Sequence, residues 1–245
     1  MDRSVKISIR TFPCVGRTQP HDKRITLRRC LVFDFDGTIA DTLGEGINIY
    51  NEIAEKNGYN VIHPDQLGEL RELDTNGLLR HLGVPKRRLP FHLAAGMRRL
   101  RSRIGQLSLI EGIREVLPLL RERSKNMGIL SSNIPENINT FLEVHGIRDE
   151  FSFISSIGKL RGKARHLRSI ARNLSLAPGE ITYVGDEIRD LRAARKAKVE
   201  VIAVTWGLNS RQSLSKENPT FLIDQPCQLL DIVSQSDLAS KRHHS

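Results

Sequence analysis

The feature that most constrains the fold is a short apolar run that ends in two acidic residues. Residues 31–33 (Leu-Val-Phe) are apolar on both faces of an extended chain, as a buried parallel strand requires. Asp34 and Asp36 follow directly, and strand geometry sends both to the same side unless the backbone breaks at Gly37. Two adjacent carboxylates at the end of a buried strand need a compensating charge, and a divalent cation supplies one readily. The stretch therefore predicts a metal site, the alternative being an acidic loop after an edge strand.

The hydrophobic periodicity beyond this stretch divides the chain into two kinds of region. Helical spacing dominates up to residue 108, and strands then alternate with helices. In the first region we expect helices at about 43–57, 65–73, 76–82 and 91–105. In the second region we expect strands at 127–130, 151–154, 181–184, 199–204 and 221–223, with helices at 113–123, 134–145, 164–174, 188–197, 210–217 and near 229. Repeated strand–helix units predict right-handed crossovers and therefore an α/β fold, a doubly wound parallel sheet.

The charge of the chain restricts the partners that we expect. The formal net charge is +10 over 245 residues, and such a positive field attracts anions. Aromatic residues make up only 5%, too few for base-stacking platforms, so nucleic acid is an unfavoured partner. Four arginines on the 91–105 helix are too close together to face one pocket, and we expect a solvated face there: Arg98, Arg99, Arg101 and Arg103.

Two further observations bear on localisation. No apolar run is long enough to cross a bilayer, so no membrane partner is expected. The three cysteines form no CxxC pair or Cys/His cluster, which argues against a zinc site and favours a reducing compartment. We expect a cytoplasmic protein, and the sequence leaves its oligomeric state open.

Small polar residues and a lysine mark two further strand ends of the expected sheet. Ligands of open α/β sheets bind beyond the carboxyl ends of the strands. Ser131 and Ser132 follow the 127–130 strand and precede a helix, so either hydroxyl could bind a phosphate there or simply cap the helix. Lys163 lies at the start of the next helix, where a cation is unfavourable unless it has a partner nearby. Lys159 competes with it, but Lys163 has Gly162 before it and the helix after it.

Three acidic residues follow the 181–184 strand. Asp186, Glu187 and Asp190 lie at the strand end and in the first helical turn. Acids at this position can serve only to cap the helix. Because Asp34 already lies at a neighbouring strand end, we interpret Asp186 as a second metal carboxylate.

These motifs, in this order, resemble those of a known family. The stretch Asp34-Phe35-Asp36-Gly37-Thr38, Ser131, Lys163 and the 185–190 segment resemble the four motifs of the haloacid dehalogenase-like hydrolases. The resemblance covers residues 31 to about 230 and is greatest to the phosphoglycolate-phosphatase-like branch. It implies a Rossmann-like core at 30–40 and 109–235, with a small α-helical cap domain inserted at 41–108. Residues 1–29 then form a basic N-terminal arm that matches nothing in the family, and 236–245 a polar C-terminal tail.

The resemblance also implies a mechanism for phosphate chemistry. Asp34 would attack phosphorus and form an aspartyl-phosphate. Mg²⁺ would be bound by Asp34, the backbone carbonyl of Asp36 and Asp186, with Glu187 or Asp190 in support. The positive charge of the metal would offset the repulsion between an anionic nucleophile and an anionic substrate.

The remaining motif residues would bind the phosphate and move protons. Lys163 and the Ser131 hydroxyl would hold phosphate oxygens, with Ser132 as the alternative to Ser131. Asp36 would protonate the leaving alcohol and then activate water, and Thr38 would orient this acid. A dehalogenase would not need Asp36, so its presence favours phosphate chemistry.

The sequence thus predicts a Mg²⁺-dependent phosphatase of small phosphorylated metabolites, with phosphoglycolate as the first candidate. A phosphosugar mutase of the same superfamily is the nearest enzymatic alternative. It is disfavoured because no histidine follows soon after Asp41. The alternative from another class is a catalytically idle, basic protein that binds nucleic acid or has a regulatory role.

Overall fold

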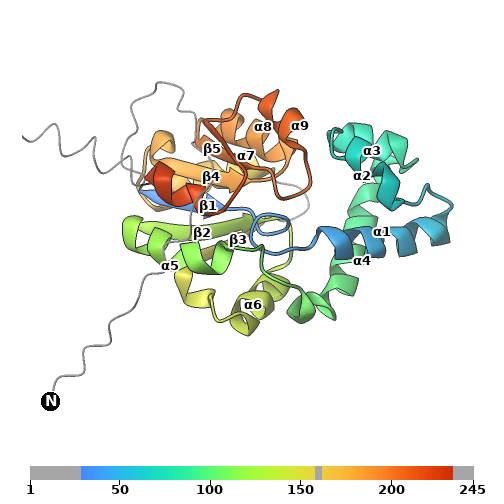
Figure 1. Cartoon of the computed structure of the whole chain (residues 1–245), viewed down its shortest axis with the longest axis horizontal. Coiled ribbons are helices and arrows are strands. Elements are labelled where there is room, and N and C mark those ends of the chain that lie inside the picture. The colour runs from blue at the N-terminus through green and yellow to red at the C-terminus, as the bar shows by residue number, and fades with distance from the viewer. Residues whose placement is uncertain (1–28, 158–161, 234–245) are drawn as a thin grey trace, which may run out of the picture.

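A parallel sheet with helices on both faces forms the larger part of the molecule, and a group of helices lies to one side of it (Figure 1). The computed structural model describes residues 29–157 and 162–233. All but the last residue of the expected basic arm, the whole C-terminal tail and Lys159 lie outside the described residues.

Within residues 29–157 and 162–233, six parallel strands form the sheet, in the order β3-β2-β1-β4-β5-β6. The strands are β1 (Cys30–Phe33), β2 (Asn126–Ser131), β3 (Phe153–Ser156), β4 (Ile181–Gly185), β5 (Glu200–Val204) and β6 (Phe221–Ile223). From β1 the chain adds β2 and β3 on one side of this strand, and then β4, β5 and β6 on the other side. The predicted doubly wound α/β fold is confirmed, and the reversal between β1 and β4 is the place where such sheets bind ligands.

The central strand β1 is buried on both faces. Leu31 and Phe33 belong to one apolar cluster, and Cys30 and Val32 belong to the other. The first face is covered by α5 (Ile113–Arg123), α6 (Pro135–Val144) and a helix that begins at residue 228. The second face is covered by α7 (Lys163–Asn173), α8 (Ile188–Ala197) and α9 (Arg211–Ser215). This double burial explains why the strand reads as a continuous apolar run instead of an alternating one.

The helical insertion, residues 41–108, separates β1 from α5. Its helices are α1 (Leu43–Asn57), α2 (Leu67–Leu70), α3 (Thr75–His81) and α4 (Leu89–Arg101). The two chain segments that enter and leave it run side by side, because Asp41 N donates to Ser108 O over 3.0 Å. Ile53 of α1 and Leu100 of α4 pack into the same apolar cluster as β1. The insertion is thus joined to the core through apolar packing, and its division from the core as a separate domain stays a prediction.

Two expected elements differ from the observed ones for reasons of tertiary contact. The helix predicted at 65–73 shortens to the four residues of α2, because the backbone oxygens of Arg71 and Leu73 accept hydrogen bonds from the core. The strand predicted at 151–154 is β3, two residues later. Gly128 of β2 pairs with Phe153, and an added Cβ at Gly128 would overlap with the Phe153 ring. Packing of that ring on the glycine sets the register.

Candidate active site

Asp34 lies at the carboxyl end of β1, and its surroundings fix both of its oxygens. Its backbone N–H donates to Val184 O over 2.8 Å, which keeps it aligned with β4. Oδ1 accepts from Phe35 N at 2.8 Å, and Oδ2 faces Lys163 Nζ at 2.5 Å. The side chain is buried. Asp34 is therefore a pre-oriented carboxylate with a cation against one oxygen.

Three buried carboxylates gather where β1, β4 and α8 meet. Oxygens of Asp34, Asp186 and Asp190 all lie within 4.8 Å of one another. Lys163 at the start of α7 contacts two of them, with Nζ 2.5 Å from both Asp34 Oδ2 and Asp190 Oδ1. The structure thus brings together the predicted residues of three motifs, which are far apart in the sequence. One lysine does not balance three carboxylates.

Burial makes this cluster electrostatically costly without a further cation. Burial raises the pKa of Asp34 well above its usual value, although the Lys163 charge opposes the rise. Burial, followed by the Glu187 and Asp190 charges, raises the pKa of Asp186 to about 7. Both shifts mean that the charged carboxylates lack sufficient compensation. Hard carboxylate oxygens at this spacing suit Mg²⁺, so the donor set fits the expected metal.

Hydrogen bonds and three glycines hold the cluster in place. Asp186 Oδ1 accepts from the Thr38 hydroxyl at 2.9 Å, and Oδ2 accepts from Leu208 N at 2.7 Å. A Cβ added to Gly37 would lie 2.5 Å from Asp186 Oδ2, and one added to Gly207 would overlap with the Asp186 side chain. A Cβ at Gly185 would lie 2.7 Å from Asp190 Oδ2. The backbone must therefore approach these carboxylates more closely than any other residue allows.

Thr38 differs from its predicted role. We expected it to orient Asp36, but its hydroxyl donates to Asp186. The reason is the turn that follows β1: Gly37 has φ +72°, and the N–H groups of residues 39 and 40 both donate to Phe35 O. The backbone breaks at Gly37, so Thr38 turns toward β4.

Asp36 is held by residues at the end of β2. Asn133 Nδ2 lies 3.1 Å from Asp36 Oδ1 and 3.3 Å from Oδ2, and the Ser131 hydroxyl lies 3.4 Å from Oδ2. Burial raises the pKa of Asp36, while hydrogen bonds from Asn133 and Thr42 and the charge of Lys163 lower it. Asp34 and Asp36 thus have different partners, the first on the α7 and α8 side and the second at β2.

The other predicted residues lie around this site. Ser131 is fully buried at the end of β2, and its oxygen accepts from Asn133 N at 3.0 Å, whereas Ser132 is partly exposed. Glu187 lies beside Asp186, but its carboxylate pairs with Arg189 over 2.6 Å. The roles of these residues stay predictions.

Sequence reasoning assigned no role at the site to Asn133. It also did not predict that Arg71 of the insertion would contact the loop beside Asp186. The Arg71 guanidinium donates to Thr205 O and Gly207 O, each over 3.0 Å. Asn209 Nδ2 in turn donates to Arg71 O over 2.9 Å. Asn133 adjoins a motif, and that position was its only signal. Arg71 belongs to no motif, and only the three-dimensional structure reveals its contacts.

The helix predicted at 91–105 ends at Arg101 as α4, so Arg103 lies beyond it, and the four arginines only partly form the expected solvated face. Arg98 and Arg101 are exposed. The other two form ion pairs with acids of α1: Arg99 with Glu52, and Arg103 with Glu45 and Glu52.

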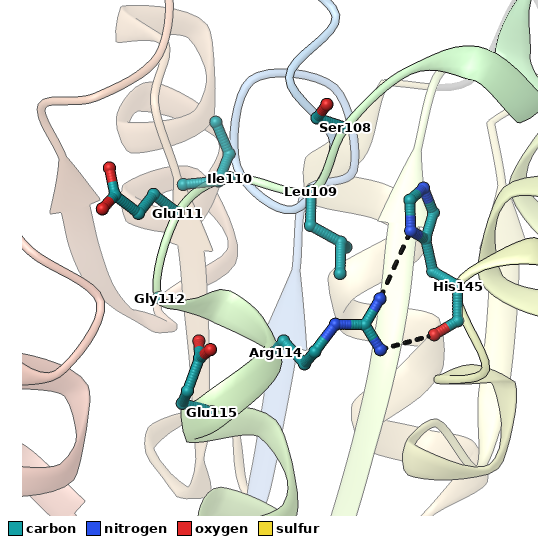
Figure 2. A pocket seen from close by; sticks show the side chains of 8 residues that line it. All are labelled: Ser108, Leu109, Ile110, Glu111, Gly112, Arg114, Glu115 and His145. Atoms are coloured by element: carbon teal, nitrogen blue, oxygen red, sulfur yellow. Dashed lines mark hydrogen bonds between the residues drawn. The ribbon is translucent and has the colours of Figure 1, made fainter.

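A surface pocket lies beside the segment that leaves the insertion (Figure 2). Its lining includes Ser108, Arg114 and His145, and Arg114 points toward His145, donating to its backbone oxygen over 2.8 Å. None of the predicted site residues lines it. The pocket is therefore separate from the buried carboxylate cluster.

Among the described residues, no helix combines the length and apolar character needed to span a membrane.

Comparisons with known proteins agree with this geometry. Residues 31–204 match the family described as haloacid dehalogenase-like hydrolase. A phosphoglycolate phosphatase from Synechococcus elongatus is 36% identical over 84% of this chain and 98% of its own. The pyrophosphatase PpaX of Bacillus velezensis is 23% identical over 86% of this chain and 97% of its own. A crystal structure described as a predicted phosphatase from Clostridium acetobutylicum superposes with a TM-score of 0.73 at 18% identity, covering 86% of this chain and all of that one.

The parallel sheet and the family match place this chain in the class of hydrolases. The chain belongs to the haloacid dehalogenase-like hydrolase family, in its phosphoglycolate-phosphatase-like branch. The predicted family and the predicted class of enzyme, a phosphatase of the haloacid dehalogenase type, are confirmed.

Proposed function

We propose that this enzyme is a Mg²⁺-dependent phosphatase that hydrolyses small phosphate monoesters, with phosphoglycolate as the first substrate to test. The observation that carries the proposal is the arrangement at the end of β1. Asp34 is fixed beside Lys163, two further carboxylates face it, and Asp36 is held separately two residues later. An attacking carboxylate, a cation for the phosphate and a separate acid are the groups that a phosphoryl transfer requires.

Asp34 is proposed as the nucleophile. Phe35 N binds Oδ1 and Lys163 Nζ binds Oδ2, and Oδ2, the oxygen beside the cation, would attack phosphorus and form an aspartyl-phosphate. Lys163 Nζ already lies against Oδ2, where it would meet the oxygens of an incoming phosphate. The Ser131 hydroxyl, or that of Ser132, would hold another oxygen at the end of β2.

Asp36 is proposed as the acid and base. It would protonate the leaving alcohol and later take a proton from the water that hydrolyses the aspartyl-phosphate. Burial raises its pKa, which favours the proton that an acid needs. Asp36 is bonded to Asn133 instead of Lys163, so acid and nucleophile occupy separate environments.

The metal would be bound by Asp34, Asp186 and the backbone carbonyl of Asp36, with Asp190 or Glu187 in support. When bound, Mg²⁺ would neutralise negative charge on the phosphoryl oxygens and on the carboxylates. The raised pKa values of Asp34 and Asp186 support this proposal, because they indicate buried acids whose charge Lys163 alone does not compensate.

Two observations guide the choice of substrate. A relative that is 36% identical, and matched over 98% of its length, is named a phosphoglycolate phosphatase; another, 23% identical and matched over 97% of its length, is named a pyrophosphatase. The net charge of +10 favours small acidic metabolites. Phosphoglycolate has both a phosphate and a carboxylate, so it suits this field.

A panel of phosphorylated metabolites, each incubated with enzyme and Mg²⁺, tests the proposal through the free phosphate released. The panel contains phosphoglycolate, phosphosugars, nucleoside monophosphates and pyrophosphate. We expect phosphoglycolate to have the highest kcat/KM, and EDTA to abolish turnover. Isomerised phosphosugar without free phosphate would favour the mutase instead. Release of no phosphate, together with tight oligonucleotide binding at physiological salt, would favour the idle binding protein.

A further inference from the structure

A chain of two asparagine side chains connects the proposed acid and base to the helical insertion. Asn133 Nδ2 donates to both oxygens of Asp36, at 3.1 and 3.3 Å. Asn133 Oδ1 accepts from Asn137 Nδ2 at 2.9 Å. Asn137 Nδ2 also reaches Met97 O of α4, 3.2 Å away. Both asparagines are buried, so water competes little for these bonds.

The direction of every bond in this chain is determined by its neighbours. Asn133 Oδ1 also accepts from Ile134 N at 2.9 Å, so its Nδ2 must be the group that faces Asp36. If the Asn137 amide were reversed, its oxygen would face two other oxygens, Asn133 Oδ1 and Met97 O. That arrangement has no proton to share. The Asn137 amide therefore donates both to Met97 O of α4 and to Asn133 Oδ1, and the Asn133 amide donates to Asp36.

The contacts of Asn137 are hard to explain by a contribution to stability alone. Its Oδ1 is buried and has no hydrogen-bond partner among the residues that the structure describes. An unsatisfied buried oxygen lowers stability, whereas an apolar residue of similar shape would not. The polar group of Asn137 thus lowers stability at this position. Its hydrogen bonds go to Met97 O of α4 and to Asn133, which holds Asp36.

We propose that Asn133 and Asn137 are positioning residues, which hold the Asp36 carboxyl in its reactive orientation and make that orientation depend on the place of α4. The inference rests on the proposed function, in which Asp36 protonates the leaving group. When α4 lies on the core, Met97 O and Asn133 Oδ1 share the Asn137 amide. When α4 moves away, Asn137 is free to turn, and Asn133 loses one of the two donors that fix its amide plane.

The test uses the leaving group as the readout. An alkyl phosphate such as phosphoglycolate needs protonation of its leaving oxygen, whereas p-nitrophenyl phosphate needs little. General acids contribute about 10²- to 10⁴-fold, so misplacing one should cost a part of this. For Asn133→Ala and for Asn137→Leu we expect the single-turnover rate of enzyme phosphorylation to fall about tenfold or more for the alkyl phosphate. The rate for p-nitrophenyl phosphate should change less than about threefold, because that leaving group needs little help from the acid.

A structural role would give a different result. Partial unfolding reduces the concentration of active enzyme and lowers both rates by the same factor. Asn137→Leu should keep its melting temperature, because it removes the unsatisfied oxygen and leaves Ile134 N on Asn133 Oδ1. Asn139→Ala is the matched control: this asparagine lies on the same helix but contacts Pro135 O and Arg148. It should leave the ratio of the two rates unchanged.

A double-mutant cycle shows whether the asparagines act through Asp36. In the Asp36→Asn background, Asn133→Ala should cause no further change in the ratio of the two rates. Equal loss for both substrates in Asn133→Ala and Asn137→Leu would overturn the inference while leaving the proposed function intact. Failure of the wild type to hydrolyse any monoester would overturn the proposed function itself. A further change in the ratio in the Asp36→Asn background would show that the asparagines act elsewhere.

Discussion

Replacing Gly185 by alanine tests how closely the backbone must approach the acidic cluster. An added Cβ would lie 2.7 Å from Asp190 Oδ2 and 3.0 Å from both Cβ and Cγ of the same residue. Comfortable contacts between carbon atoms begin at about 3.5 Å, so Asp190 must retreat by roughly 0.5–1 Å. Gly185 is not among the glycines with positive φ, so this overlap, and not backbone strain, is the perturbation.

Two consequences of Gly185→Ala follow from the overlap. Overpacking of a buried site costs about 1–3 kcal/mol, and about 2–4 °C per kcal/mol is typical for a chain of this size. We therefore expect the melting temperature to fall by about 2–12 °C. Asp190 would also move relative to Lys163, now 2.5 Å away. A displacement near 1 Å can cost about a hundredfold in rate, so kcat should fall by about ten- to a hundredfold.

Melting curves and steady-state kinetics measure both effects, with Gly179→Ala as the matched control. Gly179 lies in the turn before β4, and an added Cβ there would meet no atom within 4 Å. The control should behave like wild type. In an Asp190→Ala background, Gly185→Ala should cost less stability, because the clashing carboxylate is gone. A Gly185→Ala enzyme with unchanged melting temperature and turnover would show that the glycine is not needed for this approach.

Three further changes test the carboxylates individually. Asp34→Asn should abolish turnover and shift the melting temperature without Mg²⁺ by only about 3 °C, because relief of carboxylate repulsion offsets the lost ion pair with Lys163. Residual activity in a sample shown free of wild-type enzyme would refute the assignment of Asp34 as the nucleophile. Asp36→Asn should accumulate phosphoenzyme with p-nitrophenyl phosphate. Mass spectrometry after an acid quench would detect it as a phosphate adduct on the peptide that contains Asp34. Equal slowing of phosphorylation by both classes of substrate would refute the assignment of Asp36 as the acid. Because burial raises the pKa of Asp186 to about 7, the metal-free fold binds a proton there that the unfolded chain releases above its usual pKa of 3.8. Melting temperatures in EDTA should therefore fall from about pH 4 to pH 7, and saturating Mg²⁺ should flatten this dependence; a stability that rises with pH in EDTA would contradict the origin of the shift.

The sheet and its strand-end residues could be predicted because they depend on backbone rules. A run that is apolar on both faces specifies a central parallel strand, and such strands share one carboxyl edge. Asp34, Lys163 and Asp186 lie at the ends or beginnings of elements on that edge, so topology alone brings them together. The 2.5 Å contact of Lys163 with Asp34, and the carboxylate oxygens of Asp34 and Asp186 within 4.8 Å of each other, agree with that expectation.

The details that were missed depend on the path of turns and on single rotamers. Thr38 bonds Asp186 because the chain turns at Gly37, and no periodicity predicts where a side chain points after a turn. Asn133 reaches Asp36 only through the rotamer that its side chain adopts, and its position in the sequence suits a helix cap equally well. Predicting the contacts of Arg71 would have required knowing which loop of the core lies beside α2.

Two of the contacts between the helical insertion and the core lead to different carboxylates. On one side, Arg71 binds the carbonyl oxygens of the loop whose Leu208 N–H holds Asp186. On the other side, Met97 O shares the amide of Asn137 with the asparagine that holds Asp36. The two tethers come from α4 and from the segment after α2, which are separate parts of the insertion. A rigid displacement of the insertion that broke both tethers would change the surroundings of Asp186 and of Asp36 together.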